Sequence, residues 1–166
     1  MNLKLALALF LAVIPVLAPA QSTSKAVDSL DIEFTMYDFI EKERDTMFQL
    51  NTFYLAANYT MFSPSQNFKV TFGPYLCENE YSNDLGLILN VSYYWLRTGV
   101  LDFYASVSGA GGIRLPNNKG YASSDLKLGG DIPLAGIHLI GEGGVCFRTY
   151  AESDIFVSAG IRVGIF

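Results

Sequence analysis

Apolar and polar residues alternate along most of the chain, and the stretch "DIFVSAGIRVGIF" at its end shows this pattern most plainly. Its apolar alternate positions are Ile155, Val157, Ala159, Ile161, Val163 and Ile165. Between them lie Phe156, Ser158, Gly160, Arg162 and Gly164. A period of two residues places the two sets on opposite faces of a β-strand. Since no segment after the first twenty residues shows a helical apolar stripe, the pattern predicts an all-β protein.

Segments rich in Asn, Asp, Ser, Pro and Gly separate the alternating stretches, as turns do. The pattern predicts eight strands: Leu30–Phe39, Met47–Met61, Phe68–Cys77, Asp84–Leu96, Leu101–Arg114, Ser123–Ile132, Gly136–Tyr150 and Asp154–Phe166. Eight strands in a chain of this size match an antiparallel up-and-down transmembrane β-barrel. In the second strand the alternation changes phase before Thr52, which a β-bulge would explain.

The connections between the predicted strands differ in character. The odd ones, "IEKERDT", "ENEYSN", "LPNNKGYA" and "AESD", are more polar than the even ones, "FSPSQN", "RTGV" and "PLA". In an even-stranded barrel with both termini in the periplasm, the odd connections lie outside the cell. The acidic segments "EKERD" and "ENEYSND" are then solvated hairpin tips, or a contact surface for host molecules, partner proteins or lipopolysaccharide-bridging cations.

Composition narrows the class of protein. Of the 166 residues, 51% are hydrophobic and 16% charged, whereas soluble domains carry about 25% charged residues. The formal net charge is -5 and the basic residues are scattered, which excludes nucleic acid as a partner because phosphates require clustered Lys and Arg. Residues 1–20 combine Lys4, an apolar run and small residues before Gln21, which predicts a Sec signal peptide and a barrel domain over residues 21–166.

The alternation alone does not decide which face of the sheet points inward. A soluble lipocalin-like barrel would bury the apolar set, whereas a membrane barrel presents it to lipid. Tyr93 and Trp95 end one apolar face, where an interfacial aromatic girdle belongs, and the glycine-rich strands suit a narrow barrel. We therefore predict a lipid-facing set of Leu87, Leu89, Val91, Trp95, Phe103, Val107, Ile161 and Val163.

A signal peptide, eight alternating strands and the ending "IRVGIF" together resemble the small outer-membrane β-barrel family of the OmpA-barrel, OmpX and OmpW type. The resemblance covers the whole mature chain and rests on pattern. It implies location in the outer membrane, contact with its lipid and lipopolysaccharide, and insertion by the barrel-assembly machinery. The ending departs from the family in one respect: the positions two and four before the final aromatic are Gly164 and Arg162, not apolar residues.

The polar set would face the lumen, where a charge is costly unless it is paired. We predict an ion-pair network along the barrel axis, formed by Glu33, Lys69, Asp102, Arg114, Lys127, Glu142, Arg148 and Arg162. Arg162 lies on the last strand, so Glu33 on the first strand and Glu142 on the seventh are its expected partners. The network either fills the barrel or lines a narrow gated pore.

Candidate chemistry is sparse. His138 is the single histidine, and Glu142 follows four residues later on the same face, but both lie on a strand that rises from the periplasmic turn. The chain contains no P-loop, GxSxG or HExxH motif and no metal-binding cluster, so we expect no enzymatic activity and no cofactor. Cys77 and Cys146 fall on strands at opposite sides of the ring, which favours two free thiols, whereas a flattened barrel would bring them close enough for a disulfide.

Three functions remain open at this stage. The leading hypothesis is a non-enzymatic outer-membrane barrel that serves membrane integrity, surface contact or adhesion. The second is a narrow channel or lateral route for small hydrophobic solutes, in keeping with the OmpW side of the resemblance. The third is a soluble secreted barrel that binds an apolar ligand inside.

Overall fold

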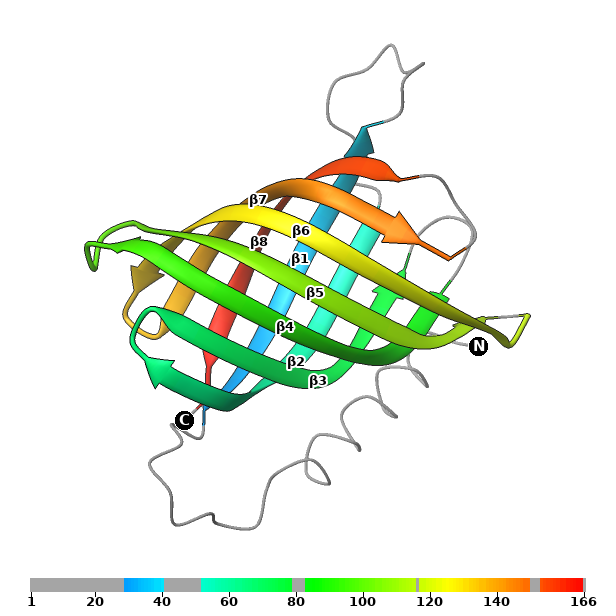
Figure 1. Cartoon of the computed structure of the whole chain (residues 1–166), viewed down its shortest axis with the longest axis horizontal. Helices are drawn as coiled ribbons and strands as arrows, with labels where there is room; N and C mark the ends of the chain where they lie inside the picture. Colours follow the sequence, from blue (N-terminus) through cyan, green and yellow to red (C-terminus); the bar gives the residue numbers. More distant parts are fainter. Residues whose placement is uncertain (1–28, 41–51, 79–82, 116, 150–152, 166) are drawn as a thin grey trace.

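The computed structural model describes residues 29–40, 52–78, 83–115, 117–149 and 153–165. These residues form eight strands in one closed antiparallel barrel, in which each strand pairs with its sequence neighbours (Figure 1). The strands are β1 (Leu30–Ile40), β2 (Thr52–Ser65), β3 (Phe68–Glu78), β4 (Asn83–Arg97), β5 (Asp102–Leu115), β6 (Lys119–Leu134), β7 (Ile137–Arg148) and β8 (Asp154–Gly164). The predicted signal peptide and Phe166 lie outside the described residues. Among the residues that are described, no helix is long and apolar enough to cross a membrane.

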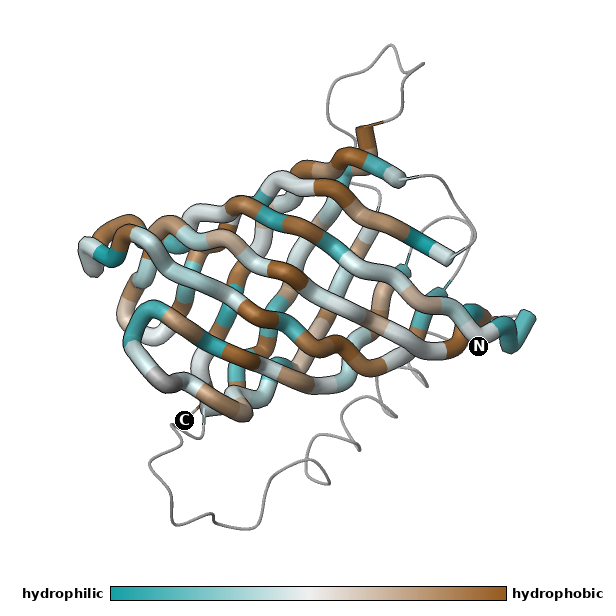
Figure 2. The backbone as a smooth tube through the Cα atoms, viewed as in Figure 1, coloured by the Kyte–Doolittle hydropathy of each residue, from teal (hydrophilic) through white to brown (hydrophobic). Residues whose placement is uncertain are grey.

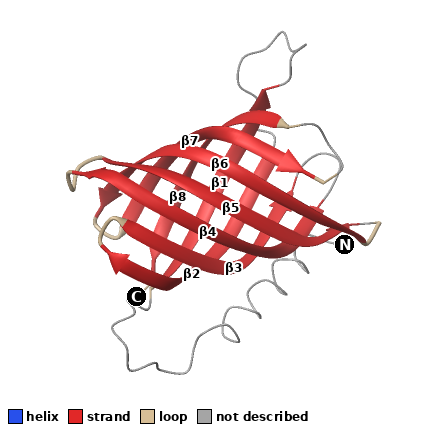
Figure 3. Cartoon of the chain, in the orientation of Figure 1, coloured by secondary structure: helices blue, strands red, loops and turns tan. Residues whose placement is uncertain are grey.

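The barrel closes where β1 pairs with β8, from Asp31 opposite Gly164 to Ile40 opposite Ile155. The start of β1 and the end of β8 therefore lie at one end of the barrel, together with the short β2–β3, β4–β5 and β6–β7 turns (Figure 3). We call this the terminal end, and the opposite one the loop end. In the β6–β7 turn, Ala135 and Gly136 have φ values of 49° and 92°, the positive pair that a two-residue hairpin requires.

The eight-stranded barrel is confirmed, and several strand boundaries differ from prediction. The predicted start of the second strand at Met47 and its bulge before Thr52 lie outside the described residues, and the irregularities in β2 fall between Thr60 and Ser65. β6 is longer than predicted at both ends, because its ladder with β5 continues to the pair Arg114–Lys119. β7 begins at Ile137 and ends at Arg148, inside the predicted limits of residues 136 and 150.

Apolar and polar residues alternate along the strands of the barrel wall (Figure 2). From β4 to β8 the large outward side chains are mostly exposed; Leu87 and Val107, for example, retain 45% and 52% of their accessible surface. Leu89, Trp95, Phe103 and Ile161 are likewise exposed, and Val91 and Val163 are half-buried in the same phase. On β1 to β3 the outward Leu30, Ala57 and Leu76 are instead buried in a small apolar cluster.

The inward phase carries most of the buried charges, whereas Asp38, also buried, lies in the outward phase of β1 opposite Val157. The inward buried charges are Asp31, Glu33, Asp84, Asp102, Lys127, Asp131 and Glu142. The barrel therefore holds its buried charges mostly inside and its large apolar side chains outside over most of its circumference, the reverse of a soluble barrel. The lumen, which holds these buried charges, is therefore the candidate functional site.

Candidate functional site

The candidate site is the lumen, and its side chains change character along the barrel axis. The half nearer the terminal end is charged, whereas the half nearer the loop end is lined by aromatic rings. The charged side chains that were predicted to form one network along the axis are paired in several places instead. All eight of its residues fall in the inward phase of their strands, but they form separate groups.

Arg162 is the centre of the first ionic group. Its Nη2 lies 3.1 Å from Oε2 of Glu33, which is its direct neighbour across the β1–β8 ladder. Its Nη1 lies 3.4 Å from Oδ2 of Asp131. All three side chains are at least 87% buried, and Glu33 also accepts a hydrogen bond from Asn58 at 3.3 Å. The expected second partner, Glu142, is replaced by Asp131.

Glu142 belongs to a second buried group. Its carboxylate accepts a hydrogen bond of 2.6 Å from the Tyr104 hydroxyl and lies 3.5 Å from Nζ of Lys127. The Ser158 hydroxyl completes the set at 3.5 Å. Tyr104 fits here because Gly129 faces it: a Cβ at Gly129 would lie 2.6 Å from Cζ of the tyrosine ring. Any larger residue at position 129 would displace the ring that orients Glu142.

The terminal end holds pairs that are more open to solvent. Lys69 lies 2.5 Å from Asp31, and His138 Nδ1 lies 2.7 Å from Oδ1 of Asp131. A cavity of about 280 Å³ opens between these residues. The structure thus places His138 beside Asp131 and Glu142 beside Lys127, so the two do not form the acid–base pair that their sequence spacing allowed.

Asp102 lies at the terminal end of β5, where it organises the β4–β5 turn. Oδ1 accepts hydrogen bonds from the backbone amides of Thr98 and Gly99, at 2.9 and 3.3 Å. Oδ2 lies 3.4 Å from Nε of Arg97. Its contacts are thus local to the turn, unlike those of Glu33 and Glu142.

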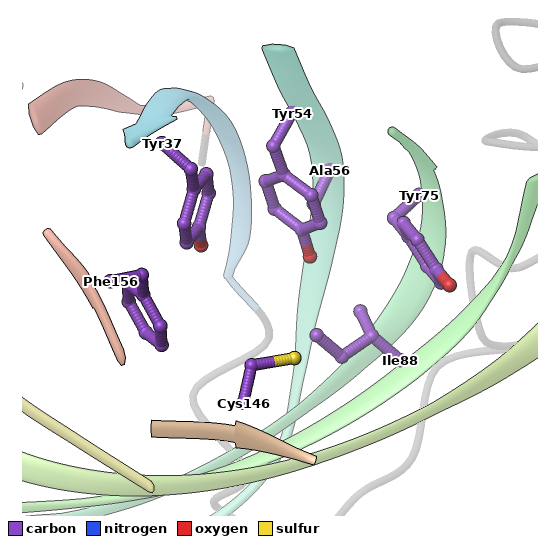
Figure 4. Close-up of a cluster of buried hydrophobic side chains, with 7 residues drawn as sticks. All are labelled: Tyr37, Tyr54, Ala56, Tyr75, Ile88, Cys146 and Phe156. Atoms are coloured by element: carbon purple, nitrogen blue, oxygen red, sulfur yellow. The ribbon is translucent and has the colours of Figure 1, made fainter. Parts of the chain in front are cut away.

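The loop half of the lumen is an aromatic cluster that the sequence analysis missed. Figure 4 shows Tyr37, Tyr54, Tyr75 and Phe156 gathered with Ile88, Ala56 and Cys146. The Tyr37 and Phe156 ring centroids are 5.2 Å apart, and those of Tyr54 and Tyr75 are 5.5 Å apart. The signal for it is the inward phase itself, in which charged residues near the terminal end give way to aromatic ones towards the odd connections along β1, β3 and β8.

Two arginines stand at the loop end of this cluster. Arg114 donates two hydrogen bonds of 2.9 Å to Asp84, one to each carboxylate oxygen. The Arg148 guanidinium lies 4.0 Å from the centre of the Phe39 ring and 3.8 Å from Asp154. Neither arginine pairs with an acid of the terminal half, so the loop end has an ionic rim of its own.

Cys77 and Cys146 are both free thiols, as predicted. They lie on β3 and β7, yet Cys77 packs against the aromatic cluster to which Cys146 belongs. Within the described part of the chain, no group of three or more His, Cys, Asp or Glu side chains is placed to hold a metal ion.

No protein-family model and no curated protein matches the chain. Among solved structures it is similar to "KdgM porin", with 13% identity and a TM-score of 0.28. It is also similar to "KdgM porin in complex with disordered oligogalacturonate", with 12% identity and a TM-score of 0.28. Each comparison covers 83% of this chain and 99% of the other. Likeness at this TM-score assigns no function to the chain, which has to be judged on its own geometry.

Proposed function

We propose that the chain is a non-enzymatic integral protein of the outer membrane, a small rigid barrel with a closed lumen that supports membrane integrity. The observation that carries this proposal is the inverted polarity of the wall. Leu87, Leu89 and Val107 are exposed on the outside, while Glu33 and Lys127 are buried inside.

The same surface argues against the soluble alternative. Soluble monomers rarely expose a continuous apolar patch larger than a few hundred Å², whereas here outward apolar side chains follow one another along β4 to β8. In a bilayer this surface meets acyl chains, and the closed ring leaves no strand edge with unpaired backbone groups. Outer-membrane lipid and lipopolysaccharide are the partners this surface fits.

The buried charged side chains at the middle of the lumen argue against the channel alternative. The Arg162 group and the Glu142 group are both buried at mid-barrel, and the charges within each group are paired. The cavities on either side of them have no lining residue in common. Side chains fill the interior of an eight-stranded barrel, and the position of these charged groups between the two cavities supports a closed lumen.

A surface-contact or adhesion role depends on the odd connections. "EKERD" and most of "ENEYSND" lie outside the described residues, so that role and insertion by the barrel-assembly machinery rest on sequence alone.

The test of membrane insertion is Leu89→Arg compared with Val100→Arg. Leu89 lies midway along β4, where an outward arginine costs about 2–4 kcal/mol in a membrane barrel, whereas Val100 lies in a terminal turn, where the cost falls to about 0–1 kcal/mol. We expect Leu89→Arg to lose the heat-modifiable folded band on gels while Val100→Arg keeps it. Equal tolerance of both changes, or release of the wild-type chain from membranes without detergent, would contradict the proposal.

The closed lumen is tested separately by planar-bilayer recording of the purified chain, with folding verified by its gel mobility. We expect no steady conductance. Reproducible conductance would overturn the closed lumen and favour the channel, while leaving the membrane location intact.

A further inference from the structure

The loop half of the lumen contains a cavity of about 80 Å³ that the structural role proposed above does not use. Its walls are the rings of Tyr37, Tyr54, Tyr75, Tyr121 and Phe156, with Ile88 between them. The walls come from six different strands, so the closed barrel holds them in place. We name this cavity, together with its walls, the aromatic cup.

We propose that the aromatic cup binds a small neutral compound built on a single ring, which enters from the loop end of the barrel. An apolar cavity of about 150 Å³ in another protein takes up benzene. The cup is smaller, but its mouth lies among partly exposed rim side chains; Arg114 and Arg148 are 35% and 26% exposed. A ring can therefore sit between the walls with one edge in the mouth.

The walls favour a ring over a flexible chain. Aromatic pairs gain about 0.5–1.5 kcal/mol beyond area burial when their centroids lie 4.5–7 Å apart in offset or edge-to-face geometry. The cup walls already pack in this manner, for example Tyr75 against Tyr121 at 6.4 Å. A bound ring would extend the same packing.

The charges at the cup favour a neutral ligand. Arg114 is matched by Asp84 and Arg148 by Asp154, while Asp125 accepts a hydrogen bond of 3.0 Å from Ser108. The lining contains two basic and two acidic side chains, so it has no net charge to attract an ion.

One buried polar group of the cup wall is available to pair with a ligand. The Tyr121 hydroxyl oxygen is buried at the cup wall and has no hydrogen-bond partner among the described residues. Leaving a buried hydroxyl unpaired costs about 1–3 kcal/mol. A hydroxyl on the ligand would satisfy it, which makes a phenol-like compound the best fit.

The experiment is a titration of the chain, folded in detergent micelles, with phenol, toluene or benzoate, followed by methyl NMR of labelled isoleucines. Ile88 reports on the cup, while the outward Ile113 and Ile161 report on compound dissolved in the micelle. We expect saturable shifts at Ile88 with phenol and toluene and none with benzoate. If Ile88 shifts only in proportion to Ile113 and Ile161, or if benzoate saturates it equally, the proposal is overturned.

Four substitutions sharpen the test. Ala110→Phe fills the cup from its lining and should abolish the saturable shift, whereas Ala159→Phe, on the outward face of β8, should leave it unchanged. Tyr121→Phe should weaken phenol binding about fivefold, the loss of one hydrogen bond, and spare toluene. If Ala110→Phe does not fold, Ser123→Leu fills the same cavity from β6. A cup-filling variant that folds and still binds phenol as the wild type does would refute the site.

Discussion

The two halves of the lumen fill the same narrow barrel by different means. In the terminal half, Arg162, Glu33 and Asp131 are buried as a set in which every member depends on a partner of opposite charge. In the loop half, Tyr37, Phe156 and their neighbours fill space by contact alone. Buried charges demand both a partner and a geometry, whereas apolar side chains demand chiefly volume and packing. The two halves should therefore fail in different ways when they are changed.

The largest effect should come from Arg162→Leu. This change leaves the Glu33 and Asp131 carboxylates buried without their shared cation, and breaking a buried ion pair costs about 3–5 kcal/mol. We expect the free energy of unfolding to fall by that amount in a urea titration of the chain in lipid vesicles. Trp95 is the single tryptophan and reports the transition.

The matched control is the neighbouring outward residue. Ile161→Leu changes shape but not polarity on the lipid side, and its effect should stay below about 1.5 kcal/mol. If Arg162→Leu lowered the free energy of unfolding no more than Ile161→Leu does, the buried ion pairs would not be what stabilises the terminal half.

The sequence predicted correctly those features that depend on the residue pattern within a single strand. Alternation reports the two faces of a strand whatever its neighbours are, so eight strands and the exposed Leu87 and Val107 could be predicted. The Glu33–Arg162 pair could also be predicted, because it joins the two strands whose pairing closes the barrel.

The other ion-pair partners depend on the register between strands and on the length of the side chains. The alternation of apolar and polar residues gives no information on either. Glu142 lies on β7 beside β8, but the register sets it opposite Ser158, while Arg162 stands opposite His138. Asp131 lies on β6, two strands away from β8, and the arginine reaches it across the narrow interior. The aromatic cup was missed for a related reason: its members come from separate strands and meet only when the ring closes.

A second substitution tests how much apolar packing stabilises the aromatic half. Phe156 is 1% exposed and lies against Tyr37 and Phe39, so Phe156→Ala should leave a cavity and cost about 3 kcal/mol. Phe103→Ala is the control, because lipid refills the space around a ring that is 36% exposed on the outside. Both are measured by the same urea titration.

Combining Phe156→Ala with Arg162→Leu then tests whether the halves are independent. Changes that share no partner add within about 0.5 kcal/mol. Phe156 packs against Tyr37 and Phe39, whereas Arg162 pairs with Glu33 and Asp131. A deviation from additivity well above that value would mean that the two halves act as one network after all.

The smallest effect gives the sharpest comparison between the two halves. It repeats the arginine-to-leucine change of the first prediction at a less buried position in the barrel. Arg114→Leu removes a cation whose geometry on Asp84 is better than that of Arg162 on Glu33, with two hydrogen bonds of 2.9 Å. Arg114 is nevertheless 35% exposed, whereas Arg162 is 13% exposed. Exposed pairs contribute about 0–1 kcal/mol because water solvates both charges when they are apart.

We therefore expect Arg114→Leu to lower the free energy of unfolding by about 1 kcal/mol or less. Salt should reduce this difference further, since the screening length shortens to about 3 Å at 1 M ionic strength, while the deficit of Arg162→Leu should persist in the dry interior. The measurement is the pair of urea titrations at low and high salt. Equal costs for the two arginines would mean that hydrogen-bond geometry, not depth in the barrel, determines what each pair contributes, and the contrast between the rim and the buried network would disappear.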